Sequence, residues 1–192
     1  MDALDAIFAR RSIGRMQPPA PNAADLEVIL RAAAVAPDHN SLRPWKFVVL
    51  EGPAKDAFGV VLADAYRARC AAARKDVVPA KEQKELTKLG RAPMVVVVCT
   101  VNRGEDKVPF VEQIAAGAAA AQNMLIAATT LGYGSMWRTG DPAYDNNVKV
   151  ALGLTRLDAI VGFIYLGTPR EDGAKEPNEA NLDDLVVRWR PA

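Results

Sequence analysis

The chain has 192 residues, of which 50% are hydrophobic, so one domain can bury a core without help from metals or disulfides. Its 24 lysines and arginines nearly balance its 23 aspartates and glutamates, and this balance argues against nucleic acid or an anionic membrane as a partner. The two cysteines, Cys70 and Cys99, lack CxxC and short metal-ligand spacing, so no metal site is predicted. We expect a single domain over residues 1–192.

The predicted elements follow from apolar periodicity and from helix-capping and helix-breaking residues. In chain order they are a helix over 2–10, a proline-rich loop over 11–22, a helix that Asn22 caps and that ends by Ala36, a polar loop over 37–44, a strand over 45–50, helices over 53–74 and 79–89, a strand over 94–100, a helix over 109–131, a strand over 133–137, a short helix from 141 to about 153, and a strand over 159–166. This order predicts an α+β fold with roughly four strands.

The longest apolar stretch, residues 114–131, is rich in alanine and is interrupted by Gln122 and Asn123. Because alanine contributes little to membrane insertion, we interpret the stretch as a buried core helix and not as a membrane span. A helix that is apolar on most faces must be buried on most faces, and a partner subunit would supply part of that burial. The alternative is that the helix forms the core of a monomer. The N-terminus lacks a basic region followed by an apolar one, so no signal peptide is predicted and a cytoplasmic location is expected.

The usual side-chain sets for catalysis are missing from the sequence. His39 is the single histidine, so neither a histidine metal site nor a clear Ser-His-Asp set can be assembled. There is also no GxGxxG or GxxxxGK[ST] motif for a nucleotide. A bound organic cofactor therefore fits the chain better than chemistry by side chains alone.

Three polar segments could form a site, and each also has an ordinary structural explanation. The run RRSIGR at 10–15 offers guanidinium and hydroxyl donors for a phosphate or a polarised ring carbonyl, or it is a solvated basic helix end. The loop APDHNSLRPW at 36–45 is dense in hydrogen-bonding groups, or it is a tight turn with local caps. The segment SMWRTGD at 135–141 combines stacking, charge and a close backbone approach, or it is a buried Trp beside a glycine turn.

Taken together, these motifs resemble those of the nitroreductase superfamily, and most closely its small, single-domain branch. The likeness extends over essentially the whole chain, including VVVVCTV, the alanine-rich helix and the closing IVGFIYLGTP. The resemblance implies a mixed, mostly antiparallel central sheet flanked by helices. It also implies a homodimer with two FMN sites at the subunit interface.

The resemblance also suggests which residues bind FMN, and they come from three places. The end of the first helix supplies Arg10, Arg11 and Ser12, with Arg15 as an additional contact; the loop of the other subunit supplies His39, with Val35 and Ser41; and the strand end supplies Trp137, Arg138, Thr139 and Gly140. Larger relatives carry a Glu-Gly pair near the flavin N5, where this chain has Thr139-Gly140, which leaves the substrate preference open. Basic tail residues serve the phosphate in those relatives, and here Lys175 is the one nearby.

The expected function is that of an FMN-dependent oxidoreductase. NADH or NADPH would reduce the flavin, and two electrons would pass through its N5 to a nitroaromatic, a quinone or a similar small acceptor. No catalytic side chain is required because water can supply the proton, and His39 is the one candidate donor. The alternatives are a non-catalytic flavin-binding protein, a sister activity such as flavin fragmentation or reductive dehalogenation with a lid within residues 64–89, and a flavin-free helical interaction module.

Overall fold

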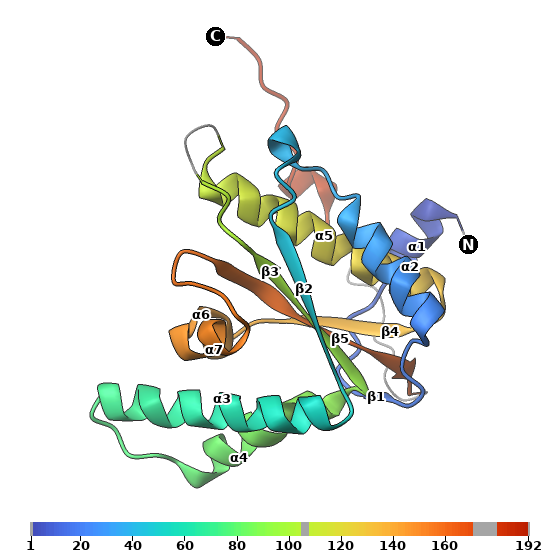
Figure 1. The fold of residues 1–192 in the computed structure, drawn as a ribbon. Coiled ribbons are helices and arrows are strands. Elements are labelled where there is room, and N and C mark those ends of the chain that lie inside the picture. The colour runs from blue at the N-terminus through green and yellow to red at the C-terminus, as the bar shows by residue number, and fades with distance from the viewer. Residues whose placement is uncertain (1, 105–107, 171–179, 192) are drawn as a thin grey trace.

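The computed structural model describes residues 2–104, 108–170 and 180–191, and within them a mixed helix and sheet fold (Figure 1). All strand pairs are antiparallel, in the order β1-β5-β3-β2 with β4 also paired to β5. The strands are β1 (Met16–Gln17), β2 (Trp45–Glu51), β3 (Met94–Thr100), β4 (Gly134–Arg138) and β5 (Ala159–Pro169). The predicted α+β class and the four predicted strands are confirmed. The two-residue β1 lies where a loop was predicted, because a pairing this short leaves no pattern in the sequence.

The helices follow the predicted order, with two corrections. They are α1 (Ala3–Ala9), α2 (Ala23–Ala34), α3 (Pro53–Ala72), α4 (Pro79–Thr87), α5 (Phe110–Thr130), α6 (Asp141–Tyr144) and α7 (Asn146–Ala151), with 3-10 turns η1 (His39–Ser41), η2 (Lys88–Arg91) and η4 (Leu182–Asp184). The single helix predicted over 141–153 is wrong, because Asp145 is extended and its side chain caps α7 at Asn147 N, 2.8 Å away. The helix predicted to end at Leu89 stops at Thr87 and tightens into η2.

The sheet lies between two helical layers, with α2 and α5 over one face and α3, α4, α6 and α7 over the other (Figure 1). Every residue of β3 is buried, as predicted for a strand covered on both faces. Alternate side chains enter different cores, so Val95, Val97 and Cys99 pack in the cluster that contains α3 residues, and Met94, Val96 and Val98 pack in the cluster that contains α5 residues.

The alanine-rich α5 packs on the sheet through small residues. Ala120, Ala121 and Ala128 are fully buried, and a Cβ at Gly117 would lie 2.4 Å from Thr100 Oγ1 on β3. The absence of a side chain at Gly117 therefore sets how closely α5 can approach the sheet. None of the helices in the described ranges combines the length and apolarity that a bilayer crossing requires.

The α3 and α4 helices pack as one unit. A Cβ at Gly59 of α3 would lie 2.2 Å from the carbonyl oxygen of Leu86 on α4, which only a glycine permits. Arg67 of α3 also pairs with Glu82 of α4. The α4 helix is thus held against α3 by direct backbone contact, and it forms a wall facing the sheet.

Cys99, predicted as a buried apolar thiol, is fully buried on β3, and burial raises its pKa from the ordinary 9.0 to about 12. The folded chain keeps this thiol neutral, whereas the unfolded chain ionises it above pH 9, so its contribution to stability is lost as the pH rises from 9 towards 12. Between pH 8 and 10.5 the loss from this group should be about 2 kcal/mol.

We expect urea unfolding at both pH values to show this loss in the native chain. In Cys99→Val the pH-dependent loss should be smaller by the same amount, because valine has no proton to release. An equal loss in both proteins would assign the alkaline sensitivity to other groups.

Candidate functional site

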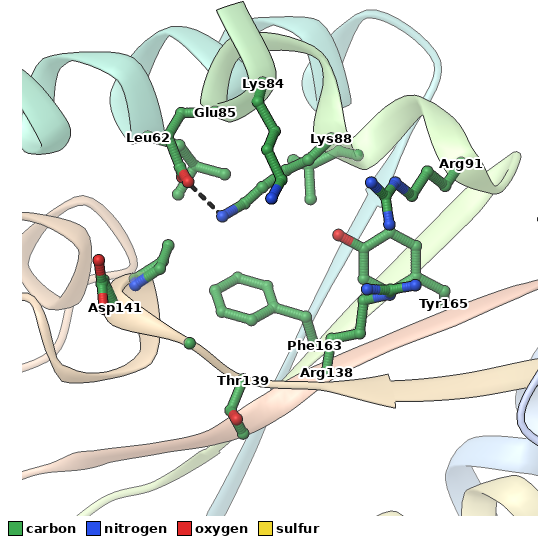
Figure 2. A pocket seen from close by; sticks show the side chains of 13 residues that line it. Leu62, Lys84, Glu85, Lys88, Arg91, Arg138, Thr139, Asp141, Phe163 and Tyr165 are labelled. Carbon is green, nitrogen blue, oxygen red and sulfur yellow. Dashed lines mark ion pairs between the residues drawn. The ribbon is translucent and has the colours of Figure 1, made fainter. Parts of the chain in front are cut away.

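A cavity of 440 Å³ opens between the sheet and α4–η2, a volume within the range of small-molecule and cofactor sites (Figure 2). Its residues come from α3, α4, η2, the end of β4, the start of α6 and the inner face of β5. They are Leu62, Lys84, Glu85, Lys88, Leu89, Arg91, Arg138, Thr139, Gly140, Asp141, Pro142, Phe163 and Tyr165. Four cationic side chains and two acidic ones thus surround an aromatic floor.

Arg138 ends β4 and projects into this cavity. Its guanidinium carbon lies 5.8 Å from the centre of the Tyr165 ring, a cation–π arrangement (Figure 2). Its Nε is buried and has no hydrogen-bond partner among the described residues. A buried donor without a partner is costly, so Arg138 is the group here that most clearly calls for a bound acceptor.

The neighbouring residues of β4 point elsewhere because side chains alternate along a strand. Trp137 packs against the core on the α5 side, and its Nε1 donates to the carbonyl of Val161 at 3.1 Å. Thr139 belongs to the cavity lining, but its side chain lies across the strand from the cationic groups (Figure 2). Gly140 follows with a φ of 91°, a backbone conformation that favours glycine.

Tyr165 forms part of the cavity floor, and Figure 2 shows its hydroxyl pointing into the cavity, with Arg91 close to the ring. Burial raises the pKa of Tyr165 to about 12, although Arg138 and Arg91 oppose the shift by favouring the phenolate. The phenol is therefore neutral across the physiological range and can donate or accept a hydrogen bond in the cavity.

The cationic wall opposite the floor was missed in the sequence. Lys84 and Lys88 are four residues apart and therefore share one face of α4–η2, and Arg91 follows three residues later. Lys88 Nζ lies 2.6 Å from Glu85 Oε2, and these two side chains are 19% and 15% exposed. The available signal was this spacing of basic residues just before a buried strand. The same spacing is found on any charged surface helix, and only the tertiary fold places this helix face opposite the sheet.

Arg10, Arg11 and Ser12, the predicted flavin contacts from the first helix, lie where α1 ends beside β4. The Ile13 amide donates to the carbonyl of Ser135 on β4 at 3.0 Å, which fixes this crossing. Arg10 Nη1 lies 3.5 Å from Ser12 Oγ, while Arg11 donates to the carbonyls of Phe8 and Arg10 and so satisfies the end of α1. Arg15 lies further along and lines a second cleft next to the cavity.

Val35, His39 and Ser41 are not brought to this cavity within one chain. They precede β2, whereas the cavity wall lies beyond its other end, and seven strand residues span about 20 Å. All three are exposed, and His39 Nδ1 lies 2.7 Å from Glu112 Oε2 of α5. Lys175 lies outside the described residues, and within those residues no cluster of three His, Cys, Asp or Glu could hold a metal.

The family model for the nitroreductase family matches residues 7–168. The chain belongs to the nitroreductase family. A relative from Escherichia coli K12, "Putative NAD(P)H nitroreductase YdjA", is 38% identical over 170 residues, covering 88% of this chain and 90% of that protein. A relative from Haemophilus influenzae, "Putative NAD(P)H nitroreductase", is 30% identical over 188 residues, covering 97% of this chain and 99% of that protein.

Solved structures confirm the nitroreductase fold. A nitroreductase-like family protein from Bacillus cereus superposes with a TM-score of 0.82 at 20% identity, covering 100% of this chain and 97% of its own. A nitroreductase with bound FMN from Bacteroides fragilis superposes with a TM-score of 0.74 at 22% identity, covering 98% and 100%. The family and fold expected from the sequence motifs are therefore confirmed.

Proposed function

We propose that this chain is an FMN-dependent NAD(P)H oxidoreductase of the nitroreductase type that works in the cytoplasm on a nitroaromatic, a quinone or a similar small acceptor. The observation that carries the proposal is the cavity at the end of β4, where the buried Arg138 Nε has no partner among the described residues. Support also comes from the names of the curated relatives and from the FMN bound to the Bacteroides fragilis protein. When bound, FMN would accept a hydride from the nicotinamide and release two electrons to the acceptor.

The residues present fit a flavin. Arg138 and Lys88 bring positive charge to the cavity, and such charge stabilises the anion that a reduced flavin ring carries. Phe163 supplies an aromatic surface, and Gly140 allows the backbone to approach a ring edge closely. Arg10, Arg11 and Ser12 are charged and hydroxyl donors for the phosphate at the end of α1.

The proposal assigns no side chain as an obligatory proton donor. The Tyr165 hydroxyl is neutral and can only hydrogen bond, since its pKa of about 12 is too high for ready proton release. The cationic groups of the wall hold charge in place, and water reaching the open side of the cavity would provide the proton.

The proposal includes a homodimer with a site shared between subunits. Large apolar side chains are exposed on the single chain on α1, near the start of α5 and along residues 180–191, among them Phe8, Val111, Val187 and Trp189 at 70% or more. Exposed apolar surface of this kind marks a protein interface. In the proposed dimer, the loop with Val35, His39 and Ser41 would reach the flavin of the other subunit, which accounts for its distance from the cavity of its own chain.

The function is tested by the absorption spectrum of the purified protein, followed by anaerobic titration with NADH and NADPH. We expect a yellow protein whose released cofactor is FMN and not FAD, and whose flavin absorbance bleaches with either donor. A protein that stays colourless after incubation with FMN would contradict the proposal. Flavin that binds but does not bleach would favour the non-catalytic binding protein.

The shared site is tested by mixing differently tagged subunits that carry His39→Ala and Arg138→Gln. Each homodimer should bind FMN poorly, since both of its sites lack one contact. The purified mixed dimer should regain one tight site, because one of its two sites receives the native residue from each subunit. A site built from one chain alone would instead give no recovery, and a monomer in sedimentation would also contradict the dimer.

A further inference from the structure

A second cleft of 360 Å³ adjoins the cavity and has a strongly basic lining. Its residues are Arg15, Met16, Lys84, Thr87, Lys88, Gly90, Arg91 and Arg170, so five of the eight are cationic and none is acidic. Lys84, Lys88 and Arg91 line the cavity as well, so the two spaces are neighbours along α4–η2. The cleft thus lies next to the proposed flavin site and includes Arg15.

Within the described residues, three of the five cationic side chains of this cleft have no carboxylate partner. Lys88 pairs with Glu85, but the described part of the chain offers Arg15, Lys84 and Arg91 no hydrogen bond and no ion pair. Like charges held together repel one another, and the chain as a whole carries a net charge of only +1. The concentration of positive charge is therefore local to this cleft, which suits a compact anion with several acceptor oxygens.

We infer that this cleft binds the 2′-phosphate of NADPH and makes NADPH the preferred electron donor. The inference rests on the proposed function, because a donor that reaches a flavin in the cavity must extend its adenosine end beyond it. NADPH differs from NADH by one phosphate monoester, which carries close to two negative charges at neutral pH. The phosphate of the flavin has its own donors at the end of α1, and neither Arg10 nor Ser12 lines the cleft.

The test compares two fragments that differ by the 2′-phosphate alone. Calorimetry on the FMN-loaded protein should show that adenosine 2′,5′-bisphosphate binds at least about tenfold tighter than adenosine 5′-monophosphate. Lys84→Gln and Arg15→Gln should each weaken binding of the bisphosphate about tenfold. Neither variant should change the affinity for the monophosphate. Lys81→Gln, which removes an exposed charge of α4 that lines neither space, is the matched control and should change neither.

A second readout is the rate of flavin reduction at increasing donor concentration. The ratio of the Kd for NADPH to the Kd for NADH should rise about tenfold in the two cleft variants. In the native protein, rising salt should weaken the binding of NADPH more than the binding of NADH. Equal affinity for the two fragments, or an unchanged ratio in both variants, would overturn the inference. Variants that weaken FMN relative to riboflavin while leaving the fragment pair unaltered would also overturn it and assign the cleft to the flavin phosphate.

Failure of the proposed function gives a different result. A protein that takes up no flavin refutes the oxidoreductase proposal, but the same fragment pair can be titrated into the flavin-free chain. Preference for the bisphosphate, lost in Lys84→Gln, would then still identify a phosphate-binding cleft, and no preference would refute both.

Discussion

Arg138→Gln is expected to weaken FMN binding by about a hundredfold while the fold stays intact. The native guanidinium brings a charge to the cavity, together with a buried donor that has no partner in the described part of the chain. Glutamine retains polarity and much of the length without the charge. A hundredfold change corresponds to about 2.7 kcal/mol, which is within the range of about 1.5 to 3 kcal/mol for one charge-assisted hydrogen bond. Flavin fluorescence during titration of the apoprotein measures the Kd.

Arg156→Gln is the matched control, since Arg156 is exposed in the turn before β5 and lines none of the hollows described above. Its FMN affinity should equal that of the native chain. Far-UV circular dichroism and the thermal midpoint should be alike for all three proteins. Unchanged FMN retention in Arg138→Gln would remove this residue from the flavin site and, with it, the observation that carries the proposed function.

Asp145→Ala is expected to lower the free energy of unfolding by about 3 kcal/mol or more. The carboxylate is buried, pairs with Arg69 of α3 and accepts from the amide of Asn147, so it joins α3 to the α6–α7 segment and caps α7. Removing one partner of a buried pair leaves the other charge uncompensated. Urea unfolding measures the change.

Asp145→Asn separates the two roles of this side chain. Asparagine keeps an acceptor for the cap but has no charge for Arg69, so it should recover about 1 kcal/mol relative to alanine. Equal stability of the two variants would show that the cap contributes nothing. A loss below about 1 kcal/mol in Asp145→Ala would show that the Arg69 pair is solvated like an ordinary surface ion pair.

The elements that the sequence predicted well are those in which the local residue pattern and the tertiary environment favour the same structure. The run from Met94 to Cys99 is apolar at every position, and only a strand covered on both faces accommodates it. Asn22 and Gly132 mark the start of α2 and the turn after α5 through their own capping chemistry. The segment after Gly140 was harder to interpret, because the break at Asp145 depends on a contact with Arg69, 76 residues away.

Some residues of the candidate site can likewise be found from a local motif, and others depend on the tertiary fold. The motif at 135–141 contains Arg138 and Gly140, which line the cavity, and a charged residue and a glycine at a strand end are visible in one short segment. Trp137 was grouped with them, although strand alternation directs it to the opposite core. Lys84, Lys88 and Arg91 were missed, because a basic helix face has the same pattern whether it meets solvent or a cavity.

The sequence by itself determined the family, the order of helices and strands, and the residue types available for an anionic cofactor, because these depend on periodicity, capping and short motifs. Only the tertiary structure decided which charged side chains lie close together. The backbone contact at Gly59 holds α4 against α3, and the pairing of β4 with β5 places Arg138 over Tyr165, so residues about fifty positions apart surround one cavity. Long-range packing of this kind depends on surfaces that form only when the chain has folded, and no local pattern encodes it.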